Sequence, residues 1–160
     1  MQDWTVDFNQ LPADGVKSLF KVDTKASLRC IIYYFYLNAR MVSVLMPVFN
    51  ESKDNLQLSI ESIVNQSYSD FEFIIINDGS NNITTQILKQ YTDPRIIIHT
   101  LPYNQGISRA LNIGLKLCRS TYILRQDSDN ISSPDRLELF LTKLQQDNSD
   151  LVYSNFSTKS

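Results

Sequence analysis

The chain has 160 residues, 42% of them hydrophobic and 20% charged, which is the balance of one ordinary globular domain. Fifteen Lys and Arg against 17 Asp and Glu leave a net charge of −2, so no basic excess is available to bind nucleic acid. The longest apolar run, residues 30–37, is far shorter than the roughly 20 residues that cross a bilayer.

Few residues suit a soft metal or a redox site. Cys30 and Cys118 stand far apart without a Cys-X-X-Cys motif, so neither a disulfide framework nor a cysteine zinc site is expected. Cys118 falls on an apolar helical face and is interpreted as an inert thiol. His99 is the single histidine, which excludes a multi-histidine metal site, and we interpret it as structural. This cysteine usage fits the reducing cytoplasm.

Residues 1–40 form an extension of unknown role, because a regular pattern begins only at residue 41. The run at 30–37 is rich in β-branched and aromatic residues, which favours a strand or a packed or partner-facing patch. Arg29 and Arg40 flank the run, so peripheral contact with a membrane surface stays open as the alternative. The chain is therefore divided into this extension and a domain portion, 41–160.

From residue 42 on, short apolar runs alternate with stretches in which apolar residues recur at helical spacing. The predicted elements are strand 42–49, helix 56–64, strand 71–76, helix 83–91, strand 95–99, helix 107–118, strand 122–124, helix 137–144 and the start of a strand in 150–153. This alternation predicts an α/β fold with a mostly parallel sheet, right-handed crossovers and flanking helices. The apolar strands further predict burial on both faces of the sheet.

Polar residues collect where the predicted strands end. They are Asn50 and Glu51, then Asn77, Asp78, Gly79 and Ser80, then Asn104 and Gly106, and finally Asp127, Ser128, Asp129 and Asn130. Ligands of open parallel sheets bind outside the carboxyl ends of the strands, so four such loops are expected to build one site. Turns are polar in any α/β protein, and that simpler reading accounts easily for Ser80 and Asn82.

Asp127-Ser128-Asp129 is the segment with the most distinctive chemistry. In extended backbone, residues two apart point the same way, so both carboxylates are expected to face one point. Adjacent carboxylates repel unless a cation or proton lies between them, and Mg²⁺ and Mn²⁺ prefer oxygen ligands. The segment predicts a metal–diphosphate site, and a solvated turn ahead of a helix is the alternative.

Several common nucleotide and hydrolase motifs are missing from the sequence. It contains no G-X-G-X-X-G after the first strand, no G-X-X-X-X-G-K-[ST] and no G-X-S-X-G. A dinucleotide-binding fingerprint, a P-loop and a hydrolase nucleophile elbow are therefore excluded.

Four blocks of the sequence carry a resemblance to a known family. They are VSVLMPVFNE, SIESIVNQSYSDFEFIIINDGS, NQGISRALNIGL and YILRQDSDNISSPDRLE. In this order and spacing they resemble family 2 glycosyltransferases, which have the Rossmann-like GT-A fold. The resemblance implies an inverting, metal-dependent transferase that moves a sugar from a nucleoside-diphosphate sugar, of UDP or dTDP type, to an acceptor hydroxyl.

The first block implies a pocket for the nucleotide base. The main chain around Pro47 and Val48 and the ring of Phe49 would line this pocket, and Glu51 would face the donor nucleotide. The family usually has tyrosine where Phe49 stands, so the stacking face is kept and the hydroxyl is lost.

The other blocks imply contacts to the rest of the donor. Asp78 would hydrogen-bond the base, and Asn104 and Gly106 would approach the donor at a helix start, where main-chain N–H groups favour anions. Asp127 and Asp129 would hold a divalent Mn²⁺ or Mg²⁺ under the diphosphate. The family usually has further aspartates at the positions of Asn77 and Asn130.

The resemblance covers the donor half of the family's domain, and the sheet is expected to be truncated after it. The family carries its acceptor half and its Asp or Glu general base beyond the matched blocks, so no catalytic base is assigned. A catalytically incomplete nucleotide-sugar-binding module that needs a partner stays open as an alternative, as does a generic nucleotide or phosphate binder. Unpaired strand edges would favour self-association or a partner chain.

Location and acceptor are implied by the resemblance alone. Family members often build cell-surface polysaccharides at the inner membrane face, with a glycan or lipid-linked acceptor. We therefore expect this chain in the cytoplasm, with the inner face of the membrane as the place of action.

Overall fold

The computed structural model describes residues 42–147 and 151–152. The extension 1–40, with its predicted strand or patch at 30–37 and Cys30, lies outside the described residues. Within the described ranges, no helix is long and apolar enough to span a membrane.

The predicted elements between residues 42 and 144 are confirmed in type and order. They are β1 (Val42–Val48), α2 (Lys53–Val64), β2 (Phe71–Asn77), α3 (Asn82–Leu88), β3 (Ile96–Thr100), α4 (Ile107–Leu115), β4 (Tyr122–Arg125) and α5 (Arg136–Asp147). The strand predicted to begin in 150–153 is not found at Leu151 and Val152, which lie in no strand. The other two residues of that range lie outside the described part of the chain.

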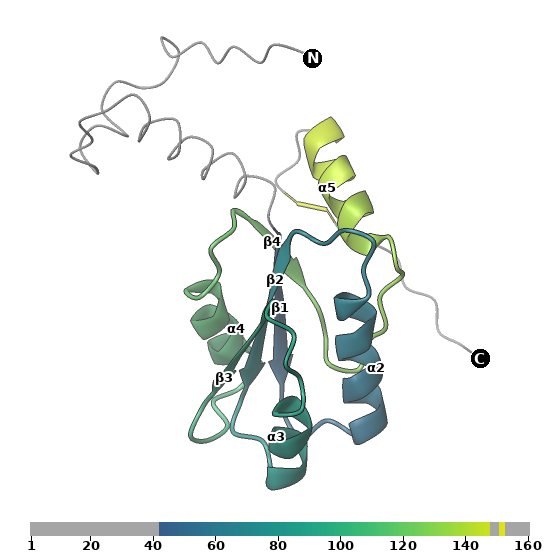
Figure 1. The fold of residues 1–160 in the computed structure, drawn as a ribbon. Helices are drawn as coiled ribbons and strands as arrows, with labels where there is room; N and C mark the ends of the chain where they lie inside the picture. The colour runs from purple at the N-terminus through teal and green to yellow at the C-terminus, as the bar shows by residue number, and fades with distance from the viewer. Residues whose placement is uncertain (1–41, 148–150, 153–160) are drawn as a thin grey trace, which may run out of the picture. The chain divides into compact units, whose positions relative to one another are not determined.

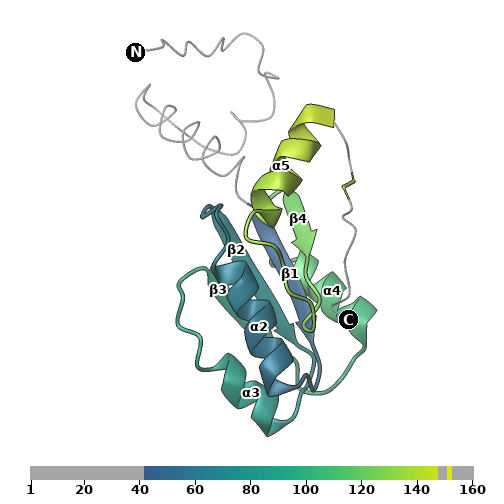
Figure 2. The same ribbon diagram turned by 90° about the vertical axis from the view of Figure 1, so that its right-hand side faces the viewer.

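The four strands form one parallel sheet in the order β3-β2-β1-β4. This confirms the predicted parallel α/β architecture. Helices cover both faces, with α4 on one side and α2 and α5 on the other (Figures 1 and 2). Each parallel pair needs a crossover, and α2, α3 and α4 provide these connections.

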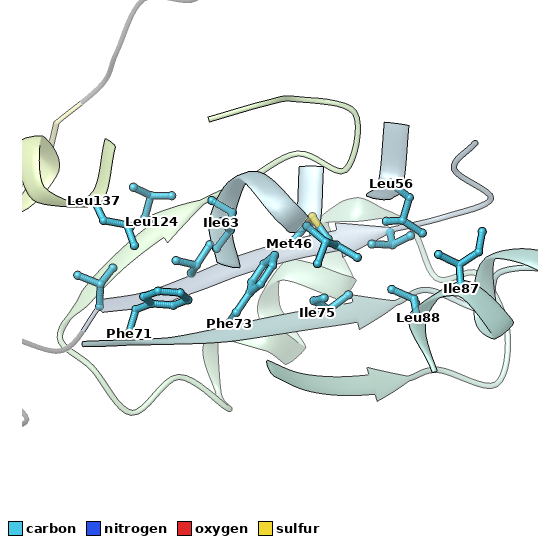
Figure 3. Packing of buried hydrophobic residues seen from close by; sticks show 14 of the residues in the cluster. Met46, Leu56, Ile63, Phe71, Phe73, Ile75, Ile87, Leu88, Leu124 and Leu137 are labelled. Carbon is cyan, nitrogen blue, oxygen red and sulfur yellow. The ribbon is translucent and has the colours of Figure 1, made fainter. Parts of the chain in front are cut away.

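The two central strands divide the core by the alternation of their side chains. One set packs with α2, α3 and α5 in the cluster drawn in Figure 3, where Phe71, Phe73 and Ile75 follow one another along β2. The opposite set, Leu45, Ile74 and Ile76, packs with Ala110 of α4. All seven residues of β1 and all seven of β2 are buried, as the apolar runs predicted.

The two outer strands do not share this burial. Ile97 on β3 and Ile123 on β4 are each 37% exposed. Their partners Ile74 and Ser43 lie on the α4 face of the sheet, where the buried strand residues come from β1 and β2. The predicted burial on both faces of the sheet therefore holds for β1 and β2 and is wrong for β3 and β4. Association through such edges stays a prediction.

Helix α4 approaches the sheet closely because it carries small residues on its inner face. A Cβ added to Gly114 would lie 2.2 Å from Leu45 Cδ1 and 3.1 Å from Ile76 Cγ1, so a glycine is required there unless the core shifts. Cys118 lies just beyond α4 and is half-buried against this cluster. Burial raises the pKa of its thiol, which agrees with the interpretation of Cys118 as inert.

A charged side chain is buried near the amino end of β2. Glu72 is 2% exposed, and its carboxylate accepts hydrogen bonds from Ser43 Oγ at 2.6 Å, Arg119 N at 2.7 Å and Arg119 Nε at 2.7 Å. Burial acts to raise the pKa of Glu72, but these hydrogen bonds and the charge of Arg119 outweigh it and lower the pKa. Glu72 thereby joins β1, β2 and the segment before β4.

We expect Glu72→Gln to flatten the acid dependence of stability. A lowered pKa in the folded state means that Glu72 stabilises the fold above its ordinary pKa of 4.5, and that this contribution is lost as the pH falls through the folded value. The free energy of unfolding of the variant should be about 1–3 kcal/mol lower than that of the unchanged protein at pH 7, because a buried partner is left unsatisfied. Urea denaturation should show a smaller difference between the two proteins at pH 3. Glu61→Gln, at an exposed side chain, is the control. A difference in free energy of unfolding between Glu72→Gln and the unchanged protein that stays the same at both pH values would contradict this account.

Candidate functional site

The parallel register brings the carboxyl ends of the strands to one edge of the sheet. Val48 pairs with Asn77, and Asn77 pairs with Thr100, so β1, β2 and β3 end level with one another. The predicted meeting of the loops that follow these strands is confirmed by the hydrogen bonds between them.

Strand β4 ends earlier than its neighbour β1. Arg125 pairs with Leu45, and Gln126 N then donates to Leu45 O at 3.0 Å. Pro47 comes two residues after Leu45, so its nitrogen points to the same side of β1, beyond the point where β4 ends. A proline is tolerated there because no ladder hydrogen bond is lost. The loop after β4 therefore begins beside the last residues of β1.

The loop after β1 is fastened to the loop after β2. Asp78 N donates to Val48 O at 2.8 Å, Asn50 N to Ser80 Oγ at 3.1 Å, and Asn81 N to Asn50 Oδ1 at 2.8 Å. Asn50 has a φ of 51°, a left-handed conformation that asparagine tolerates better than most residues. Phe49, just before it, is 49% exposed, so a large part of its ring faces solvent at this edge.

Asp78 holds the segment that leads into α4. Its side chain is 3% exposed, and Oδ1 accepts from Gln105 N at 2.8 Å while Oδ2 accepts from Gly106 N at 2.9 Å. Gly79 has a φ of +67°, and a Cβ there would lie 2.5 Å from Asn104 N. The turn after β2 and the segment before α4 are thus in direct contact, and only glycine fits at position 79.

Gly106 is the N-cap residue of α4, and the space where a side chain would stand is open. Its φ is +85°, its N–H is shared between Asp78 and Asn104 Oδ1, and apart from the adjoining residues of the chain no described atom lies within 4 Å of where a Cβ would stand. A ligand can therefore approach the main chain here. Asn77, in contrast, serves the turn: it is fully buried, accepts from Ser80 N at 3.0 Å and donates to Thr85 Oγ1 at 3.2 Å.

The Asp127–Asp129 segment is a turn, and the expectation of extended backbone there is wrong. Asn130 N donates to Asp127 O at 3.2 Å, which closes the chain on itself. The alternation of a strand therefore does not govern where the two carboxylates point. Asp127 Oδ1 pairs with Arg125 at 2.8 Å, and Asp129 is exposed.

The donor set at this turn suits a hard divalent cation. Asp127 and Asp129 offer carboxylate oxygens, which Mg²⁺ and Mn²⁺ prefer. In residues 42–147 and 151–152, no group of three or more His, Cys, Asp or Glu side chains could hold a metal. A cation at this turn would therefore take its remaining ligands from a bound phosphate and water.

Glu51 connects the first loop to this turn. Its Oε2 accepts from Ser128 Oγ at 3.3 Å, while Oε1 accepts from Ser52 N at 2.9 Å and Asn55 Nδ2 at 3.1 Å. The same carboxylate thus supports the start of α2 and touches the residue between Asp127 and Asp129.

A buried amide that the sequence analysis missed lies under the turn. Gln126 is 1% exposed, and its Nε2 donates to Ser59 Oγ at 3.1 Å and to Asn130 O at 2.6 Å. Its Oε1 accepts from Ser132 Oγ at 2.8 Å and from Arg136 Nη1 at 2.5 Å. Burial lowers the pKa of Arg136, and the negative charge of Asp127 opposes that effect.

Signals for two of these residues were present in the sequence. Ser59 falls between Leu56 and Ile60 on the apolar face of the predicted helix, where a hydroxyl needs a partner. Gln126 directly follows an apolar strand. Arg136 offered no such signal, because its place is decided by how α5 packs. His99, interpreted as structural, is exposed on β3.

Comparison with known proteins identifies the family. Residues 43–160 match the model of glycosyl transferase family 2. The chain belongs to this family. The O-antigen biosynthesis glycosyltransferase WbnJ of Escherichia coli is 46% identical over 112 residues, which cover 67% of this chain and 43% of WbnJ. The chain thus spans less than half of that family 2 relative.

Solved structures show that this family 2 chain has the GT-A fold. Residues 1–349 of TarS from S. aureus, in complex with UDP, match with a TM-score of 0.63 and 24% identity, over 69% of this chain and 33% of that one. A mannosyltransferase, PcManGT from Pyrobaculum calidifontis in complex with GDP-Man and Mn²⁺, matches with a TM-score of 0.56 and 19% identity. That match covers 69% of this chain and 37% of PcManGT.

We expect Asp78→Asn to loosen the segment before α4. An amide can accept only one of the two main-chain hydrogen bonds, and its NH₂ would face the other N–H group. Amide hydrogen exchange at Gln105 and Gly106 should accelerate, and the free energy of unfolding should fall by about 1–3 kcal/mol. Asp70→Asn, with the same loss of charge at an exposed side chain, is the control. Unchanged exchange at both amides would contradict the role given to Asp78.

Proposed function

We propose that residues 42–138 bind the nucleotide part of a nucleoside-diphosphate sugar, as the donor portion of a glycosyltransferase. The observation that carries this proposal is the joining of four loops at one sheet edge, in a chain that belongs to glycosyl transferase family 2. The edge offers an exposed ring, an open glycine at a helix start and two carboxylates in one turn. These are the groups that a base, a diphosphate and a cation require.

The base is proposed to lie near the ends of β1 and β2. The half-exposed ring of Phe49 offers a stacking face, and the main chain around Pro47 and Val48 forms the floor beside it. Asp78 has both oxygens engaged by main-chain N–H groups, and each carboxylate oxygen can accept a second hydrogen bond. Asp78 can therefore accept from a ring N–H of uracil or thymine while it holds the segment before α4.

The diphosphate is proposed to lie between the start of α4 and the turn after β4. Asn104 and Gly106 would border it on one side, with Glu51 facing the nucleotide and Asp127 and Asp129 on the other side. These two carboxylates would hold Mn²⁺ or Mg²⁺, which offsets the charge that develops on the departing nucleoside diphosphate. Two solved structures of the same fold, one in complex with UDP and one with GDP-Man and Mn²⁺, support a nucleotide-sugar donor and a divalent cation.

The reaction is proposed to be an inverting transfer to a hydroxyl of a glycan or lipid-linked acceptor in cell-surface polysaccharide synthesis, at the inner membrane face. The similarity to an O-antigen biosynthesis enzyme supports this class of acceptor. The acceptor hydroxyl needs a general base on the opposite face of the sugar. We assign no described residue to that role, and a binding module completed by a partner chain is the second candidate.

The metal proposal predicts that UDP binds more tightly with Mn²⁺ than without it. Calorimetry on the unchanged chain should show this gain, and Asp129→Asn should abolish it by removing one anionic ligand. Asp135→Asn, an equal charge loss at an exposed side chain a few residues later, should leave the gain intact. If the unchanged chain binds UDP with the same affinity with and without Mn²⁺, the metal proposal is overturned and a generic nucleotide binder is favoured.

The base proposal predicts that Phe49→Ala weakens UDP binding about 5- to 150-fold, the range expected for loss of one base–aromatic stack. Phe49→Tyr keeps the ring and should retain the affinity within about threefold. Equal affinities for the unchanged chain and Phe49→Ala would place the base elsewhere.

A further inference from the structure

The turn that carries Asp127 and Asp129 is held from below by side chains of other elements. Ser59 Oγ, from α2, donates to Asp127 O at 3.0 Å. Gln126 Nε2 donates to Asn130 O at 2.6 Å, and Arg136 Nη2, from the first residue of α5, donates to Arg125 O at 3.2 Å. Three main-chain carbonyls at and around the two aspartates, those of Arg125, Asp127 and Asn130, are therefore fixed by side-chain donors.

The orientation of Gln126 is forced by its partners. Arg136 can only donate, so it must face the amide oxygen, and the carbonyl of Asn130 can only accept, so it must face the NH₂ group. All four hydrogen-bonding positions of this buried amide are used. Loss of Arg136 would leave one of them without its charged donor, and unmet buried polar groups are costly.

Arg136 occupies the centre of this arrangement. Its Nη1 donates to Gln126 Oε1 and to Ser132 Oγ, the latter at 2.8 Å, and its Nη2 reaches the carbonyl of Arg125. The guanidinium thus ties the residues just before the turn to the residues just before α5. A planar group with several fixed donors can make all three contacts at once, which a lysine cannot.

From these contacts we infer that Arg136 is a positioning residue, which holds the Asp127–Asp129 turn in the shape that binds the cation–diphosphate through Gln126 and the Arg125 carbonyl. This inference rests on the proposed donor site. It assigns a function to a residue that offers no ligand itself. Groups that orient metal ligands in this way affect metal affinity without contacting the metal.

The test compares Arg136→Met with Lys143→Met in the full chain. Lys143 lies on the same helix, is exposed and loses the same charge. The first readout is the ¹⁵N heteronuclear NOE of the amides of residues 127–130 without any ligand. The second is Mn²⁺ affinity in the presence of UDP, measured by the electron paramagnetic resonance signal of free Mn²⁺.

Arg136→Met should lower the NOE at the turn while the amides of β1 and β2 keep their values. It should also weaken Mn²⁺ binding about 10- to 100-fold, the range seen when the partner of a metal ligand is removed. Metal-free UDP binding should stay within about twofold, and Lys143→Met should change neither readout. A residue with a merely structural role would lower thermal stability and leave the Mn²⁺ affinity of the folded protein unchanged.

Two further variants keep the inference testable. Arg136→Lys keeps the charge but not the paired donors, so it should show an intermediate loss and serves if Arg136→Met does not fold. The double variant Gln126→Met with Arg136→Met should bind Mn²⁺ within about twofold of whichever single variant binds it less tightly. The reason is that the two side chains act as a unit, so the second substitution removes little more.

The possible failures are distinguishable. An Mn²⁺ affinity of Arg136→Met within about twofold of the unchanged protein, or an unchanged NOE at the turn, overturns this inference and leaves the proposed function standing. Absence of Mn²⁺-dependent binding in the unchanged protein overturns the metal site itself, and this assignment with it.

Discussion

The parallel pairing of β1 with β2 and with β4 is the constraint on which the candidate site depends. Because all three strands run the same way, their carboxyl ends and the loops that follow must emerge at one edge of the sheet. The central strands stay in register because their side chains are buried on both faces, so a slip by one residue would exchange the two halves of the core. The packing of Phe73 and Ile74 on opposite faces therefore fixes where the polar loops meet.

Main-chain groups hold these loops together as much as side chains do. Asp78 accepts two N–H groups from the segment before α4, and Val48 offers its carbonyl to Asp78 in return. Polar groups that are hydrogen-bonded within the protein are less mobile. The loops are therefore preorganised, and less conformational entropy is lost when a ligand binds. The same residues that are proposed to contact the donor thus also prepare the shape of the site.

Charge is handled differently at the two ends of the sheet. Glu72, near the amino end, is buried and fully paired with Ser43 and Arg119, so its charge is neutralised within the protein. Asp129, at the carboxyl end, is exposed, and Asp127 forms its ion pair with the exposed Arg125. A buried ion pair is costly to break, whereas an exposed one contributes little, so the Asp127 carboxylate can exchange Arg125 for a cation at small cost.

The sequence by itself determined the order of the elements, the parallel sheet and the positions of the polar loops, because hydrophobic period and strand–helix alternation are local properties of the chain. Its four blocks also carried the resemblance that family membership confirms. Two features depended on tertiary structure. Burial of an apolar strand depends on which helix packs over each of its faces, and on the α4 face the buried strand residues belong to β1 and β2. The turn at Asp127 and its support by Arg136 depend on where α2 and α5 pack, because hydrogen bonds between residues far apart along the chain cannot be read from spacing.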